Sequence, residues 1–204
     1  MVYIPKHITQ RDASDPCQWT NCWATIGAWA SRGASRNAVK GTPSRFRRWA
    51  RRPDCQTGGL GDIARGLGRK GLWSRMVINA GKRRRNARYL DDRTPAKMRK
   101  LFLAKPKGGG KLYAAESDFN VWPVKERCSA TFGDRKNAYH MIGIVPGEGK
   151  GRNKGKVRVE DPLCNRYNWV NVDRVIRAIV TYNNEHGEKR DTADLIVINV
   201  PDRT

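Results

Sequence analysis

The spacing of apolar residues changes along this chain, and that change most constrains the fold. Between residues 22 and 67 the apolar residues recur every three or four positions, as on one face of an α-helix. From residue 121 onward they form short runs rich in Val and Ile, a composition typical of β-strands. Helices followed by strands predict an α+β fold, in which amino-terminal helices pack on a carboxy-terminal antiparallel sheet.

The expected elements form one domain over residues 1–204, with a helical part at 17–71, a basic segment at 80–112 and a sheet part at 119–200. Thr42-Pro43 is a typical helix start, because Thr caps a helix and Pro suits its first turn. Helices are expected at 22–32, 44–52, 60–67 and 94–102. Strands are expected at 76–78, 121–124, 129–132, 140–145, 157–160 and 195–200, and segment 172–179 fits either a helix or a strand.

Positive charge is concentrated in the middle of the chain. The whole chain has 41 Lys and Arg against 19 Asp and Glu, and residues 69–156 alone contain 23 basic and 7 acidic side chains. Such an excess favours a polyanionic partner: nucleic acid, an anionic cell-wall polymer or an acidic protein surface. Few aromatic residues accompany the charges, so sequence-specific readout of bases is not expected. We expect the binding or assembly surface to include Lys82, Arg83, Arg84, Arg85, Arg88, Arg99 and Lys100.

The cysteines show no regular framework. An odd count argues against a disulfide-stapled secreted domain, and the lack of a close CxxC pair argues against a zinc site. The first residues contain no apolar run typical of a signal peptide, and no segment of about 18 apolar residues is present to span a membrane. We therefore expect a protein made in a cytoplasm, without a membrane span. The five cysteines are Cys17, Cys22, Cys55, Cys128 and Cys164.

Cys22 is the candidate nucleophile, because it stands where the first expected helix begins. The amino terminus of a helix stabilises a thiolate through its dipole and its unpaired N–H groups. A glutamine a few residues upstream can donate its side-chain NH₂ to an oxyanion beside the Cys22 backbone N–H. Gln18 is the first choice for this donor, and Gln10 is the alternative.

His140 is the candidate base, because it is the histidine expected on a rigid element, the strand at 140–145. His7 and His186 lie in polar segments and are expected at the surface. Asp161 ends the next expected strand, and a glycine-rich hairpin tip would bring it beside His140. There it would fix the tautomer of His140 and stabilise its cation. The alternative interpretation is that Cys22 is a small buried residue and that Asp161 only ends a strand.

This order of residues resembles papain-like cysteine peptidases, in which Gln, Cys-Trp-Ala, His and Asp occur in sequence. The strand that begins at His140, its glycine-rich turn and the Val-Arg-Val-Glu-Asp-Pro segment at 157–162 resemble the branch related to double-glycine leader peptidases. A similar set is found in cysteine-peptidase-like proteins of actinobacterial phages. The likeness covers residues 10–67 and 137–163. Trp23 stands where the leader peptidases carry Gly, and their transporter domain is missing.

The resemblance implies an amide hydrolase that uses Cys22, His140, Asp161 and Gln18 and needs no metal or organic cofactor. It implies a tail-associated component of a phage virion, made in the host bacterial cytoplasm and acting on cell-wall peptides or on a phage protein. Other virion proteins are then the expected partners. One alternative is a catalytically silent structural virion protein of the same fold, docking through its basic surface on an acidic partner or DNA. Another is a general nucleic-acid-binding protein.

Overall fold

The computed structural model describes residues 4–9, 17, 21–35, 41–52, 54–72, 74–77, 94–105, 110–118, 139–164, 166–186 and 195–201. It confirms the α+β architecture with an antiparallel sheet. The sheet has six strands in the order β1-β6-β2-β3-β4-β5, and every neighbouring pair is antiparallel. The strands are β1 (Ser74–Val77), β2 (Lys111–Asp118), β3 (Tyr139–Val145), β4 (Lys156–Glu160), β5 (Asn168–Asn171) and β6 (Leu195–Asn199).

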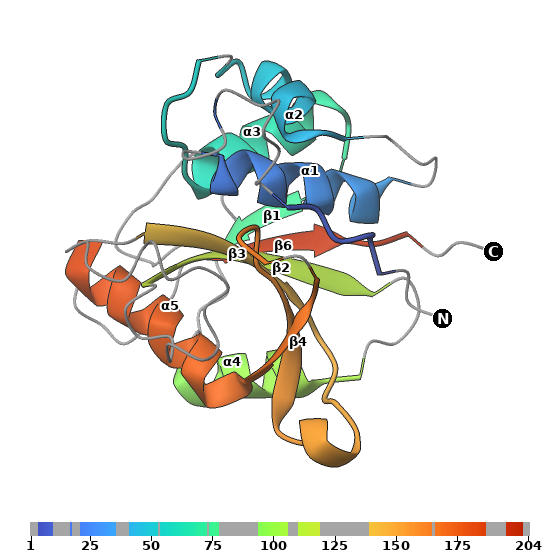
Figure 1. Cartoon of the computed structure of the whole chain (residues 1–204), viewed down its shortest axis with the longest axis vertical. Helices are drawn as coiled ribbons and strands as arrows, with labels where there is room; N and C mark the ends of the chain where they lie inside the picture. Colours follow the sequence, from blue (N-terminus) through green and yellow to red (C-terminus); the bar gives the residue numbers. More distant parts are fainter. Residues whose placement is uncertain are drawn as a thin grey trace.

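The three amino-terminal helices cover one face of this sheet (Figure 1). They are α1 (Cys22–Ala34), α2 (Pro43–Trp49) and α3 (Leu60–Arg69). Thr42 caps α2 as expected, since its hydroxyl accepts a hydrogen bond from the Arg45 N–H over 3.3 Å. At Gly143 of β3, a Cβ atom would lie 2.6 Å from the ring of Trp29. The absence of a side chain there lets α1 pack closely on β3.

The opposite face is covered by α4 (Pro95–Leu103) and α5 (Val172–His186), so the sheet lies between two helical layers (Figure 1). Of these helices α4 was expected, whereas α5 resolves the ambiguous segment 172–179 as a helix. Strand β2 was missed because both of its faces are buried. Leu112 faces the first helical layer and Tyr113 the second, so the strand shows no alternation of polar and apolar residues.

Several expectations about single segments need correction or lie outside the described residues. Strand β5 was not expected, and His186 ends α5 instead of lying in a loop. The strands expected at 121–124 and 129–132 fall outside the described part of the chain. No helix among the described residues is long and apolar enough to cross a membrane.

The expectation that the cysteines form no disulfide framework is wrong. Cys17 is bonded to Cys55, 38 residues further along the chain, and Cys164 is also disulfide-bonded. The first bridge joins Cys55, in the loop between α2 and α3, to Cys17, which precedes α1. Irregular spacing in the sequence hides such pairs, since disulfide connectivity depends on the fold.

Candidate active site

Cys22 is the first residue of α1, at the end of the helix where backbone N–H groups have no intrahelical partner. The first helical hydrogen bond runs from the Thr25 N–H to the Asn21 carbonyl over 2.9 Å. No acidic residue occupies the first turn, so nothing there opposes an anion. The neighbouring Trp23 is buried, and its Nε1 donates to the Gln56 carbonyl over 3.2 Å. The helix start is therefore anchored, while the Cys22 thiol is half-buried and free of a disulfide.

The pairing of β3 with β4 places His140 beside Asp161. The register pairs Gly143 of β3 with Glu160, the last residue of β4. The first residues of β3, which include His140, therefore lie beside the residues that follow β4, which include Asp161. His140 Nε2 and Asp161 Oδ1 lie 2.7 Å apart, and both side chains are buried. The same oxygen also accepts from the Leu163 N–H over 2.9 Å. Ser117 on β2 fixes the His140 backbone, because its hydroxyl donates to the His140 carbonyl over 2.9 Å.

The His140 ring lies between Asp161 and Cys22. The ring is hydrogen-bonded to Asp161, and it lies close enough to Cys22 for the thiol to contribute to its raised pKa. The structure thus brings together the three residues that the sequence singled out, from three separate elements.

The charges of these groups favour an ion pair. Burial lowers the pKa of His140, but the charge and hydrogen bond of Asp161, together with Cys22, outweigh it and raise the pKa to about 10. Burial raises the pKa of Asp161, but the charge and hydrogen bond of His140 and the Leu163 N–H lower it overall. At neutral pH the pair is therefore an imidazolium and a carboxylate.

This pair should make the free energy of unfolding depend on pH. The pKa of His140 is raised above its ordinary value of 6.5, so its contribution is complete below pH 6.5 and is lost as the pH rises to about 10. The pKa of Asp161 is lowered, so its contribution is present above its ordinary 3.8 and is lost in acid. We expect His140→Gln to destabilise the protein more at pH 6 than at pH 10, as measured by urea unfolding. Equal destabilisation at both values would contradict the raised pKa of His140.

Arg47 is a buried residue of the site that sequence reasoning missed. It lies on α2 with 5% of its surface exposed, and its Nη1 donates to the Asn21 Oδ1 over 2.5 Å. Asn21 immediately precedes Cys22 and is also buried. A fixed cation therefore supports the backbone from which the nucleophile projects. The sequence offers one weak signal, the position of Arg47 next to Phe46 at the edge of the apolar face of α2.

His7 is not a surface residue, which corrects the expectation. Its Nδ1 lies 2.7 Å from Oε2 of Glu160, whose side chain is fully buried, and its Nε2 lies 2.8 Å from the Cys164 carbonyl. The Ile8 N–H donates to the other Glu160 oxygen over 2.9 Å. Burial lowers the pKa of His7, but Glu160 raises it overall. The pair ties segment 4–9 to the turn that holds Asp161.

The remaining predicted residues are not part of this cluster. Gln18, Gln10, Lys82, Arg83, Arg84, Arg85 and Arg88 lie outside the described residues. Arg99 and Lys100 are exposed on α4, on the sheet face opposite to α1. Arg99 Nε lies 3.4 Å from an oxygen of Asp173 on α5, so the charge of Arg99 is already paired.

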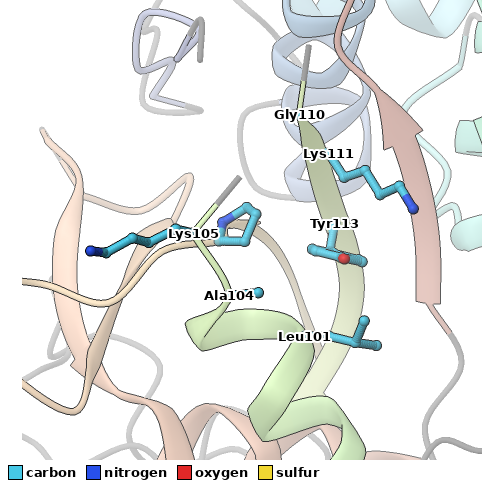
Figure 2. Close-up of a pocket in the computed structure, with 7 residues that line it drawn as sticks. Leu101, Ala104, Lys105, Gly110, Lys111 and Tyr113 are labelled. Atoms are coloured by element: carbon cyan, nitrogen blue, oxygen red, sulfur yellow. The ribbon is translucent and has the colours of Figure 1, made fainter. Parts of the chain in front are cut away.

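A pocket of about 300 Å³ lies away from Cys22, between α4 and the start of β2 (Figure 2). It contains none of the three clustered residues. Within the described part of the chain, no group of three or more His, Cys, Asp or Glu side chains is placed to hold a metal ion. The residues that line the pocket are Leu101, Ala104, Lys105, Gly110, Lys111, Tyr113 and Pro146.

Together these contacts describe a thiol, an imidazole and a carboxylate in series, at the start of a helix packed on a sheet. Such a series can form and release an acyl group on sulfur. Comparison of the chain with protein-family models and with curated proteins gives no match.

Proposed function

We propose that this chain is a papain-like cysteine peptidase or amide hydrolase. Cys22 is the nucleophile, His140 its acid–base partner and Asp161 the group that orients His140. The observation that carries the proposal is the buried His140 ring, hydrogen-bonded to the Asp161 carboxylate over 2.7 Å and close enough to Cys22 for the thiol to influence its pKa. A nucleophile, a base and an orienting group in contact are the usual requirement for covalent acyl transfer.

The first half of the reaction follows from the charges. His140 carries a proton at neutral pH. In the proposed reactive form this imidazolium is paired with a Cys22 thiolate. The thiolate attacks the carbonyl carbon of the amide, and the negative charge that forms on oxygen accepts a hydrogen bond from the Cys22 N–H. We propose Gln18, with Gln10 as the alternative, as the second donor. The C–N bond then breaks, His140 protonates the leaving nitrogen, and a thioester remains on Cys22.

The second half returns the protein to its starting state. Neutral His140 takes a proton from water, and the water oxygen attacks the thioester carbonyl. The C–S bond breaks, the carboxylic acid leaves and Cys22 departs as a thiolate. The bond from His140 Nε2 to Asp161 holds the ring in place during both proton transfers. The complete cycle consumes one amide bond and one water molecule and regenerates Cys22 and His140.

We further propose that the protein is a tail-associated component of a phage virion that cleaves cell-wall peptides or a phage protein. The order of motifs from Cys22 to Asp161, which resembles phage cysteine-peptidase-like proteins, supports this setting. The disulfide bonds support it independently, because disulfides persist in oxidising surroundings outside the cytosol.

The test is the rate at which iodoacetamide alkylates Cys22 at pH 6, followed by mass spectrometry of the peptide that contains it. We expect folded Cys22 to react about tenfold faster than in urea, because thiolate is the reactive form and His140 stabilises it only in the folded chain. The reference is the unfolded protein, since Cys17, Cys55 and Cys164 are disulfide-bonded.

His140→Gln should remove this difference in rate. Asp173→Asn is the matched control, because it changes an exposed side chain on α5 that contacts Arg99. Equal rates in the folded and unfolded wild-type protein would contradict the enzymatic proposal. That result would favour a structural virion protein of the same fold without turnover.

A further inference from the structure

Helices α2 and α3 present a compact group of cations where they end. Arg51 follows α2, Arg65 and Arg69 lie on α3 and Lys70 follows it, and all four are exposed. Trp49 lies among them. Arg69 Nη1 donates to the Trp49 carbonyl over 3.4 Å, and Lys70 Nζ lies 5.1 Å from the centre of the indole ring. We call these five residues the α2–α3 patch; its helices lie above α1 in Figure 1.

The cations of the α2–α3 patch repel one another and are poorly balanced. Loss of hydration and the neighbouring charges of Arg51 and Arg65 lower the pKa of the Arg69 guanidinium. One carboxylate, Asp62, lies 2.9 Å from Arg65 and 3.3 Å from Arg52. Among the described residues, neither Arg51 nor Arg69 has a carboxylate partner. A bound anion would relieve this repulsion.

The backbone at Arg51 gives an independent indication that its side chain is used. Its φ is 56°, in the left-handed region. The Arg51 N–H donates to the Arg48 carbonyl over 3.1 Å and the Arg52 N–H to the Arg47 carbonyl over 2.8 Å. This is the helix-ending turn whose left-handed position is usually glycine. A long cation at a position that glycine suits better points to a role for the side chain itself.

We infer that the α2–α3 patch binds the phosphate backbone of nucleic acid without reading its sequence. Guanidinium groups donate paired hydrogen bonds to phosphate oxygens, and three of the four cations are arginines. Trp49 adds an aromatic ring on which a base can stack. The net charge of +22 attracts a phosphate polymer at long range. Binding to a local acidic surface on a protein would not require so large a charge over the whole chain. This activity does not depend on turnover at Cys22.

The test is fluorescence anisotropy of labelled DNA oligonucleotides, single-stranded and duplex, at several salt concentrations. We expect the double variant Arg51→Ala/Arg69→Ala to bind at least about tenfold more weakly and to lower the slope of log affinity against log salt by about 2. The matched control, Lys150→Ala/Lys154→Ala, removes two exposed charges from the β3–β4 hairpin. It should weaken binding less than about threefold and leave the slope nearly unchanged.

Arg51→Gly separates binding from folding. Glycine suits the left-handed backbone, so Tm should rise while affinity for DNA falls. Equal weakening by the two double variants would overturn the inference, because it would indicate attraction to the whole molecule. Unchanged affinity of Arg51→Gly would overturn it as well. Displacement of the oligonucleotide by poly-L-glutamate as readily as by unlabelled DNA would instead assign the α2–α3 patch to an acidic protein.

Discussion

Replacing Cys22 by Ala is expected to lower kcat/KM for amide hydrolysis by about 10⁴-fold or more, because the covalent route is lost with its nucleophile. The fold should survive, since the thiol is half-buried and the change removes a single sulfur atom. The measurement is mass spectrometry of products from cell-wall peptides and peptide mixtures, with wild-type protein as the reference. Circular dichroism and urea unfolding of the variant show whether it is folded.

The other two residues of the triad should give graded losses. His140→Ala removes the proton carrier, so we expect a loss close to that of Cys22→Ala, because triad members act as a unit. Asp161→Ala removes the oxygen that accepts hydrogen bonds from both the His140 ring and the Leu163 N–H, so it should lower hydrolysis more than Asp161→Asn does. Asp161→Asn should lose much less, because a single oxygen, Oδ1, accepts both bonds and an amide oxygen can replace it.

Asp173→Asn is again the control, and it should hydrolyse at the wild-type rate. Retained hydrolysis in Cys22→Ala would contradict the assignment of the nucleophile. Equal losses in Asp161→Asn and Asp161→Ala would show that the negative charge, rather than the hydrogen-bond geometry, is what His140 needs.

The sequence predicts the elements whose residues face two different environments. Helix α3 is amphipathic, and its apolar stripe was read directly from Leu60, Ile63 and Leu67. Strand β2 is buried on both faces, so its sequence shows no alternation of polar and apolar side chains. Its place between β6 and β3 depends on pairing between distant segments, which local patterns do not encode.

The contact between His140 and Asp161 was predictable because both residues belong to one hairpin. Two neighbouring strands joined by a glycine-rich turn must pair, and the ends of the pair then meet. Cys22 reaches His140 through the packing of α1 on β3, which the order of motifs indicated only by resemblance. Arg47 and His7 were not predictable, since each is buried by a partner more than twenty residues away.

Removing the Cys17–Cys55 disulfide is expected to have the second large effect, on stability and on reactivity together. The bridge closes a loop of 38 residues, and the chain-entropy relation for such a loop gives about 4 kcal/mol. This is a large share of the 5–15 kcal/mol or so that stabilises a typical domain. We expect Cys17→Ser/Cys55→Ser to lower the free energy of unfolding by about that amount.

Removing the Cys17–Cys55 disulfide should also lower the reactivity of Cys22, because the disulfide holds the loop that contacts the start of α1. Gln56 follows Cys55 directly, and its carbonyl accepts the hydrogen bond from Trp23, the residue next to Cys22. Loosening the loop frees the start of α1, so the thiol should lose part of its advantage in alkylation over the unfolded chain. An alkylation rate in Cys17→Ser/Cys55→Ser equal to that of the wild-type protein would contradict this chain of contacts.

Urea unfolding followed by tryptophan fluorescence measures the stability term, since free energy falls linearly with denaturant. Cys22→Ala is the matched control, because it removes a sulfur without opening the cross-link, and it should unfold near the wild-type midpoint. Reductant should shift the wild-type midpoint further downward than that of the double variant, which keeps the disulfide at Cys164. If the double variant and the wild-type protein differ by less than about 1 kcal/mol, native strain or residual structure in the unfolded chain cancels the entropic gain. The bridge would then hold the start of α1 in place without stabilising the domain, and only the alkylation rate of Cys22 would report its loss.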